Sequence, residues 1–278
     1  TIKCSGGPLG GGVDDAGYRT EIYPGAAQFM LELARGRSDM RWGPERLPPL
    51  VRLLSARPEK VGFLHMKPRS AVAREFQRIA GENGFPSWGL DLNSSRYGRI
   101  RDILPAAWGN FEGFRRTKVK NWAAELGSDA GQPRAIFVGD NGQGDVQAAL
   151  SMAELGPPFV AAFIHHVLDT PLEQWTFMDP GFHDSEIDVR ALQKRRIHVF
   201  SGYLHASSIA LKLGLVSRSG HARVGREVIS SNLARLCRLH AQDPSSFTHY
   251  PCLREAKGVT QLFWQDGSEV PAELGLLP

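Results

Sequence analysis

Two aspartates that follow an apolar run in the middle of the chain are the clearest candidates for chemistry. The run over residues 135–138 predicts a buried strand that ends at Gly139-Asp140, and Asp145 follows where a helix is expected to begin. In open α/β sheets, ligands bind at the carboxyl ends of the strands. Two carboxylates joined there by a glycine-containing turn suit Mg²⁺, which takes few carboxylates, several waters and phosphate oxygens. We therefore predict a magnesium site with Asp140 and Asp145 as ligands.

The turn between these two aspartates also has a simpler interpretation. An aspartate at the start of a helix often accepts a hydrogen bond from the backbone, and Asp145 would then be only a helix cap. We favour metal binding because the apolar residues before the turn define a strand so clearly.

The elements that would position these residues alternate along the chain, which indicates βαβ units, a parallel sheet and an α/β fold. Apolar runs predict strands over residues 51–54, 88–92, 135–138, 159–164 and 197–200. Helical spacing of apolar residues predicts helices over residues 26–35, 71–79, 117–126, 146–155, 206–213 and 227–240. We assign residues 1–215 to a core and residues 216–278 to a helical and irregular extension of the same domain.

The composition predicts a cytoplasmic protein. The chain has 278 residues, 42% of them hydrophobic, which is enough for one sizeable core. Its formal charge of +4 does not imply nucleic acid, and we interpret the basic runs 115–120 and 194–196 as solvated surface. The three cysteines lack the spacing of a zinc site, and no apolar run is long enough to span a membrane.

Two other candidate binding sites are weaker. The glycine run over residues 6–12 lacks the Lys and the Ser or Thr that a phosphate-binding P-loop requires. His165-His166 lie next to each other on a predicted strand, so we expect one to be buried and the other exposed, not a metal-binding pair.

The aspartate pair resembles the fourth motif of the haloacid dehalogenase (HAD) superfamily, in which Gly-Asp is followed by a second Asp five residues after the first. The second motif of that superfamily is a Ser or Thr at a strand end, which Ser55 matches. The third is a Lys ahead of the fourth-motif strand, which Lys118 matches. The first is Asp-x-Asp-x-Thr, and Thr1 matches its last residue. The resemblance implies a three-layer, Rossmann-like fold with a mainly parallel central sheet.

The wider context is similar to one subfamily, the catalytic domain of the actin-patch phosphatidate phosphatases and their uncharacterised relatives. The matching segments are residues 1–3, 21–25 and 163–167, and the resemblance covers roughly residues 1–215. It implies a Mg²⁺-dependent phosphomonoester hydrolase that acts through an aspartyl-phosphate intermediate. The attacking Asp, and a second Asp that acts as general acid and then base, would lie just upstream of Thr1.

The resemblance also assigns roles within the chain. Ser55 would donate a hydrogen bond to a phosphoryl oxygen, although it could be an ordinary polar residue where strand 51–54 gives way to a loop. Lys118 would neutralise the phosphoryl charge, with Lys120 as its competitor for that role. Asp140 would bind Mg²⁺ directly, and Asp145 would hold it through water or orient Lys118. Arg57 and Thr1 are candidates for substrate binding.

A strand that carries the nucleophile would lie in the middle of the sheet. We therefore expect the 278-residue chain alone to be poorly stable or inactive. The alternative function is a truncated pseudo-phosphatase that binds a phosphorylated ligand or a protein partner. The substrate stays open between a phosphorylated small molecule and a phospholipid. Aromatic residues near Arg115-Arg116 would suit peripheral membrane contact or a core; they are Trp88, Trp108, Phe111 and Phe114.

Overall fold

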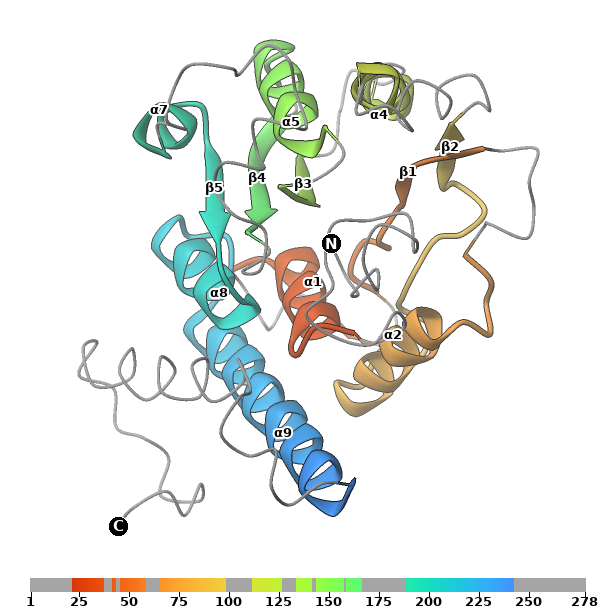
Figure 1. Ribbon diagram of the computed structural model, residues 1–278, viewed down its shortest axis with the longest axis vertical. Helices are drawn as coiled ribbons and strands as arrows, with labels where there is room; N and C mark the ends of the chain where they lie inside the picture. Colours follow the sequence, from red (N-terminus) through yellow and green to blue (C-terminus); the bar gives the residue numbers. More distant parts are fainter. Residues whose placement is uncertain are drawn as a thin grey trace.

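The computed structural model describes residues 22–37, 42–43, 46–58, 66–98, 112–126, 134–141, 144–157, 159–166 and 189–242. Helices and strands alternate along these segments (Figure 1). In chain order they are α1 (Ala26–Arg35), β1 (Leu54–Pro58), α2 (Ala71–Glu82), β2 (Arg96–Gly98), α4 (Glu112–Leu126), β3 (Ala135–Asp140), α5 (Asp145–Glu154), β4 (Phe159–His165), α7 (Val189–Lys194), β5 (Ile197–Phe200), α8 (Tyr203–Lys212) and α9 (Arg218–Gln242).

The strands form two parallel sheets. The larger sheet has the order β3-β4-β5, and the smaller one pairs β1 with β2. Figure 1 shows the smaller sheet beyond β3, on the side away from β4. Among the described strands, none pairs with the outer edge of β3. The predicted α/β class with parallel strands is confirmed.

Apolar side chains cover both faces of the larger sheet, which gives three layers. Helices α1, α8 and α9 pack on one face, and helices α4, α5 and α7 pack on the other (Figure 1). The first cluster includes Phe29, Phe163, Phe200, Leu204 and Val224. The second cluster includes Trp122, Phe137, Met152, Ile164 and Leu192. Phe163 and Ile164 fall in different clusters because successive side chains of a strand point to opposite faces.

Helix α4 connects the two sheets. Its residue Trp122 packs in the core beside β3, while Glu125 faces the smaller sheet. Glu125 accepts a hydrogen bond of 2.6 Å from Arg52, just before β1, and another from Arg96 of β2. The position of the smaller sheet is therefore tied to the helix that covers the larger one.

The structure confirms the strands of the larger sheet and corrects those of the smaller one. We expected a strand over residues 51–54 and a loop after it, but β1 begins at Leu54 and contains Ser55. The N–H group of Leu53 donates instead to the Ser95 hydroxyl, so the regular ladder starts one residue later. The predicted strand over residues 88–92 contributes only a single bridge, and β2 lies further on.

Two helices begin at least five residues before the start that their apolar spacing predicted. Helix α4 begins at Glu112, where ion pairs with Arg115 and Arg116 support an additional first turn. Helix α9 begins at Arg218, because the Ser217 hydroxyl accepts a hydrogen bond from the N–H group of Gly220. Helix α9 packs against α1 and α8, so this part of the predicted extension lies on the core.

The aromatic residues that could have formed a lipid-binding surface are divided. Trp88 and Phe114 are buried, and Trp88 stacks on Phe76 at 5.5 Å between ring centroids. The predicted packing in the core is therefore confirmed for Trp88 and Phe114. Trp108 and Phe111 lie outside the described residues.

A buried ion pair fastens α9 to α1. Glu32 is fully buried, and both of its carboxylate oxygens accept hydrogen bonds of 2.8 Å from the Arg223 guanidinium. Gln28 donates a further bond of 2.6 Å to the same carboxylate. A buried carboxylate is stable only with such partners, because its removal from water is costly.

We predict that Arg223→Met destabilises the protein by about 3 kcal/mol, because the buried Glu32 carboxylate loses its two-bond partner and keeps only Arg35, at 3.6 Å, as a cation. The matched control is Arg195→Met, which removes a pair with Glu154 that is exposed on both sides (52% and 66%). That change should cost at most about 1 kcal/mol. Urea unfolding measures both, and equal losses for the two variants would contradict the prediction.

Candidate functional site at the end of strand β3

One face of α4 carries a lysine among aromatic residues. Phe114, Lys118 and Trp122 are spaced four residues apart, so they lie on the same side of the helix, and all three are buried. Trp122 anchors this side, with its ring 6.4 Å from that of Phe137 and 6.1 Å from that of Phe159. Lys118 is only 7% exposed and therefore requires an anionic partner.

Asp145 is that partner. One of its carboxylate oxygens accepts a hydrogen bond from Lys118 Nζ, and the other accepts the backbone N–H of Asp140 at 3.1 Å. The residue at the cap position of α5 is Gly144, not Asp145, which is the first helical residue. The helix-cap interpretation of Asp145 is therefore wrong, because its carboxylate reaches back to β3 and across to α4.

Gly139 makes this close approach possible. A Cβ atom at this position would lie 2.6 Å from Asp145 Oδ2 and 2.9 Å from Asp145 Cβ, closer than real Cβ atoms come to any neighbour. The position of the Asp145 side chain therefore requires a glycine at position 139.

The remaining predicted site residues lie in different places. Ser55 is the second residue of β1, a strand that packs against α4. Arg57 also belongs to β1, but its side chain lies outside the described part, and so does Thr1. Lys120 is exposed, so of the two candidate lysines it is Lys118 that meets the aspartates. The structure thus joins Lys118, Asp140 and Asp145 by direct bonds, and it places Ser55 on a strand that packs against the same helix, α4.

A group of aromatic and imidazole rings borders Asp140 and was not predicted from the sequence. Asp140 and His165 are register partners in β3 and β4, so their side chains share one face of the sheet. Tyr203 lies beside His165, with ring centroids 5.7 Å apart. Burial, together with the charge of Asp140, raises the pKa of the Tyr203 hydroxyl. This group could have been found by aligning the carboxyl ends of the predicted strands 135–138 and 159–164 and comparing the residues that follow them.

Burial also decides the charge of His165, which is 4% exposed. It lowers the pKa of the ring to about 3, and a hydrogen bond with the Ser201 backbone opposes this only in part. The ring is therefore neutral at physiological pH. His166 is only partly buried, so it is more exposed than His165, as predicted, although it is not fully exposed.

The donor set fits Mg²⁺ rather than a metal that needs several protein ligands. Within the described residues, no group of three or more His, Cys, Asp or Glu side chains could hold a metal ion. Magnesium commonly uses one or two carboxylates and completes its shell with water and phosphate oxygens. Both oxygens of the Asp145 carboxylate already accept hydrogen bonds, from Lys118 and from the Asp140 backbone.

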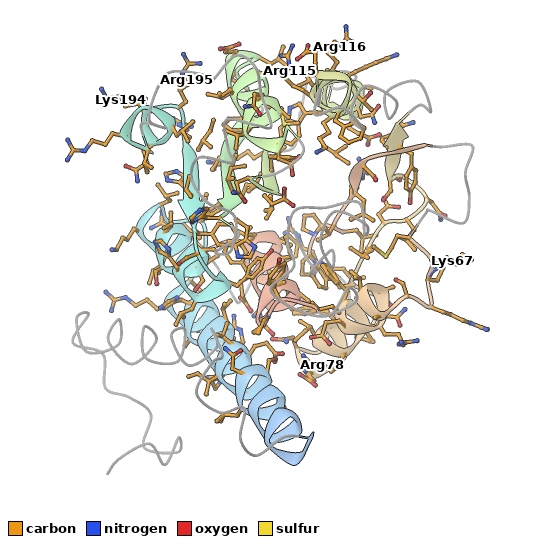
Figure 2. All side chains as sticks on the ribbon, in the orientation of Figure 1. Lys67, Arg78, Arg115, Arg116, Lys194 and Arg195 are labelled. Atoms are coloured by element: carbon orange, nitrogen blue, oxygen red, sulfur yellow. The ribbon has the colours of Figure 1, made fainter. Side chains whose placement is uncertain are left out.

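The basic runs lie at the periphery of the fold. Figure 2 shows Arg115 and Arg116 on α4, and Lys194 and Arg195 at the end of α7. Arg116 is 71% exposed and Lys120 is exposed, as expected of solvated surface. The expectation is wrong for Lys118 of the same run, which is buried, and Arg115 is partly buried and bonds Glu112 and Ser151. None of the described helices combines the length and the apolar character that a membrane crossing requires. Comparison with family models, with curated proteins and with solved structures finds no match for this chain.

We predict that Gly139→Ala destabilises the protein by about 1–3 kcal/mol, because the added methyl group displaces the Asp145 carboxylate. The control is Gly81→Ala in helix α2, where an added Cβ meets nothing within 4 Å. That change should stabilise by about 0.5–1 kcal/mol, since alanine favours the helix. Opposite shifts of the urea midpoint are expected, and a neutral Gly139→Ala variant would refute the close approach.

Lys118→Met should cost about 3 kcal/mol or more, because it leaves the nearly buried Asp145 carboxylate without its cation. Lys120→Met, two residues away on the exposed side of α4, should change stability by less than about 0.5 kcal/mol. Thermal or urea unfolding separates the two variants, and similar effects would show that Lys118 is an ordinary surface lysine.

Proposed function

We propose that this protein is a Mg²⁺-dependent phosphomonoester hydrolase of the HAD type. The observation that carries the proposal is the junction at the end of β3, where Asp145 holds both Lys118 and the backbone of Asp140. A cation, a carboxylate and the backbone of a second aspartate meet there, at the end of a parallel strand. That combination suits the binding of a phosphoryl group together with a hard metal ion.

Each of these groups has a distinct task in the proposed reaction. Mg²⁺, when bound, neutralises charge on the phosphoryl oxygens. Asp140 would bind the metal ion, and Lys118 would place its ammonium group against the phosphoryl group and the attacking carboxylate. Asp145 would orient Lys118 and the turn. Ser55 would donate a hydrogen bond to a phosphoryl oxygen, and Arg57 and Thr1 would contact the substrate. Positioning and charge neutralisation supply most of the catalysis in phosphoryl transfer.

The proposed nucleophile belongs to a strand between the two sheets. The outer edge of β3 has no partner among the described strands, and the smaller sheet lies beyond it (Figure 1). The HAD resemblance expects one further parallel strand in that place, ending in the attacking aspartate. We propose that this strand carries the nucleophile and, as the resemblance implies, lies upstream of Thr1. The phosphatidate preference of the subfamily rests on the resemblance alone.

We predict that a polypeptide extended upstream of Thr1 to include that strand releases phosphate from p-nitrophenyl phosphate, and that EDTA abolishes the release. Asp140→Asn in this polypeptide should lower the rate at least about 100-fold, because the metal ligand loses its charge. Glu154→Gln, at a carboxylate that is 66% exposed, is the matched control and should leave the rate unchanged.

The outcomes separate the candidate functions. Failure of the extended polypeptide to release phosphate would refute the hydrolase. Activity of the 278-residue chain alone would refute the assignment of the nucleophile. If the upstream sequence encodes no strand that ends in aspartate, the pseudo-phosphatase is the better description.

A further inference from the structure

The face of the sheet that carries the Asp140 side chain continues into His165. The two residues are register partners in strands that lie about 4.8 Å apart in such a sheet. On this face, Phe200 stacks on the His165 ring at 4.9 Å, Tyr23 meets it edge-on at 4.6 Å, and Tyr203 lies 5.7 Å away. Aromatic rings thus surround His165 on several sides, and Asp140 is its neighbour in the row across the sheet.

Two polar atoms in this group are buried and, within the described part of the chain, have no hydrogen-bond partner. They are His165 Nδ1 and the Tyr23 hydroxyl. Buried polar atoms nearly always have a partner, and at a binding site the ligand often supplies it. Because they belong to residues in edge-to-face contact, one small group could serve both atoms.

The tautomer of His165 determines which kind of group this is. The hydrogen bond with the Ser201 backbone favours the protonated ring, so a ring N–H donates it. Since Nδ1 has no partner, we assign the donating nitrogen as Nε2, which leaves a lone pair on Nδ1 of the neutral ring. Nδ1 therefore accepts a hydrogen bond, and the Tyr23 hydroxyl can donate one to the same group. A hydroxyl group of a ligand meets both requirements.

We propose that Tyr23 and His165 bind a hydroxyl group of the substrate on the carbon next to the phosphorylated one, so that the preferred substrates are polyol monophosphates. This inference rests on the proposed hydrolase site, which would hold the phosphoryl group at Asp140 and Lys118 and direct the alcohol part toward His165. A phosphatidate carries no such hydroxyl, because the oxygen on the neighbouring carbon is esterified. The two residues would therefore select against it.

The test compares two ligands that differ only in hydroxyl groups. Calorimetry measures binding of sn-glycerol 3-phosphate and of n-propyl phosphate to the 278-residue chain in the presence of Mg²⁺, so no turnover is needed. We expect the glycerol ester to bind about tenfold more tightly. Tyr23→Phe should remove most of that preference and leave the affinity for propyl phosphate unchanged. Tyr97→Phe, the same deletion on β2 of the other sheet, is the control and should change neither affinity.

The outcomes distinguish the inference from the proposal beneath it. Equal affinities in the unaltered protein, or a preference that survives Tyr23→Phe, would overturn the hydroxyl site and leave the hydrolase standing. If neither ligand binds in the presence of Mg²⁺, the hydroxyl site is overturned, and phosphate release by the extended polypeptide decides the hydrolase separately. Lysophosphatidate, which keeps one free hydroxyl, separates a lipid source from a free one. If the lipid is the source, lysophosphatidate should bind with the same dependence on Tyr23. If glycerol phosphate binds and lysophosphatidate does not, the ligand is the free polyol ester.

Discussion

A lysine buried on the packed side of α4 determines the geometry of the site. Lys118 lies between Phe114 and Trp122 on the side of α4 that packs on the larger sheet, where an unpaired charge would be strongly destabilising. Asp145 supplies the counter-charge and thereby fixes the start of α5 against α4. Its second oxygen fixes the backbone of Asp140, and this double contact leaves no room for a side chain at residue 139. The arrangement of the end of β3 thus follows from one buried charge.

A second buried pair performs a comparable task on the opposite layer. Glu32 and Arg223 join α1 to α9 on the face of the sheet that holds His165 and Tyr203. Helix α1 begins at Ala26, whose N–H group donates to the Tyr23 carbonyl at 3.1 Å, so the placement of α1 also sets the placement of that tyrosine. One ion pair therefore positions the phosphoryl side of the proposed site, and the other supports the side that faces the alcohol.

The sequence predicted the larger sheet well and the smaller one poorly, for a physical reason. Residues 135–138 and 159–164 are continuous apolar runs, and only His198 interrupts residues 197–200, because helices cover both faces of these strands. Strands β1 and β2 are short and partly polar, and their limits depend on the bond between Leu53 and Ser95. Asp140, Asp145 and Lys118 could be found from local motifs. The neighbours Tyr23, His165 and Tyr203 could not, because register between distant strands brings them together.

The charges of the described site separate binding from turnover. Lys118 contributes +1 and the two aspartates contribute −2, so the set has a net charge of −1 and attracts a divalent cation. With that cation the sum becomes +1, which attracts a phosphate dianion even before an attacking carboxylate is added. A further aspartate at the edge of β3 would bring the sum to zero, so it would weaken ground-state attraction while supplying the nucleophile. In the proposed hydrolase, ligand recognition would therefore reside in the described residues, while the chemical step would depend on one more carboxylate beside β3.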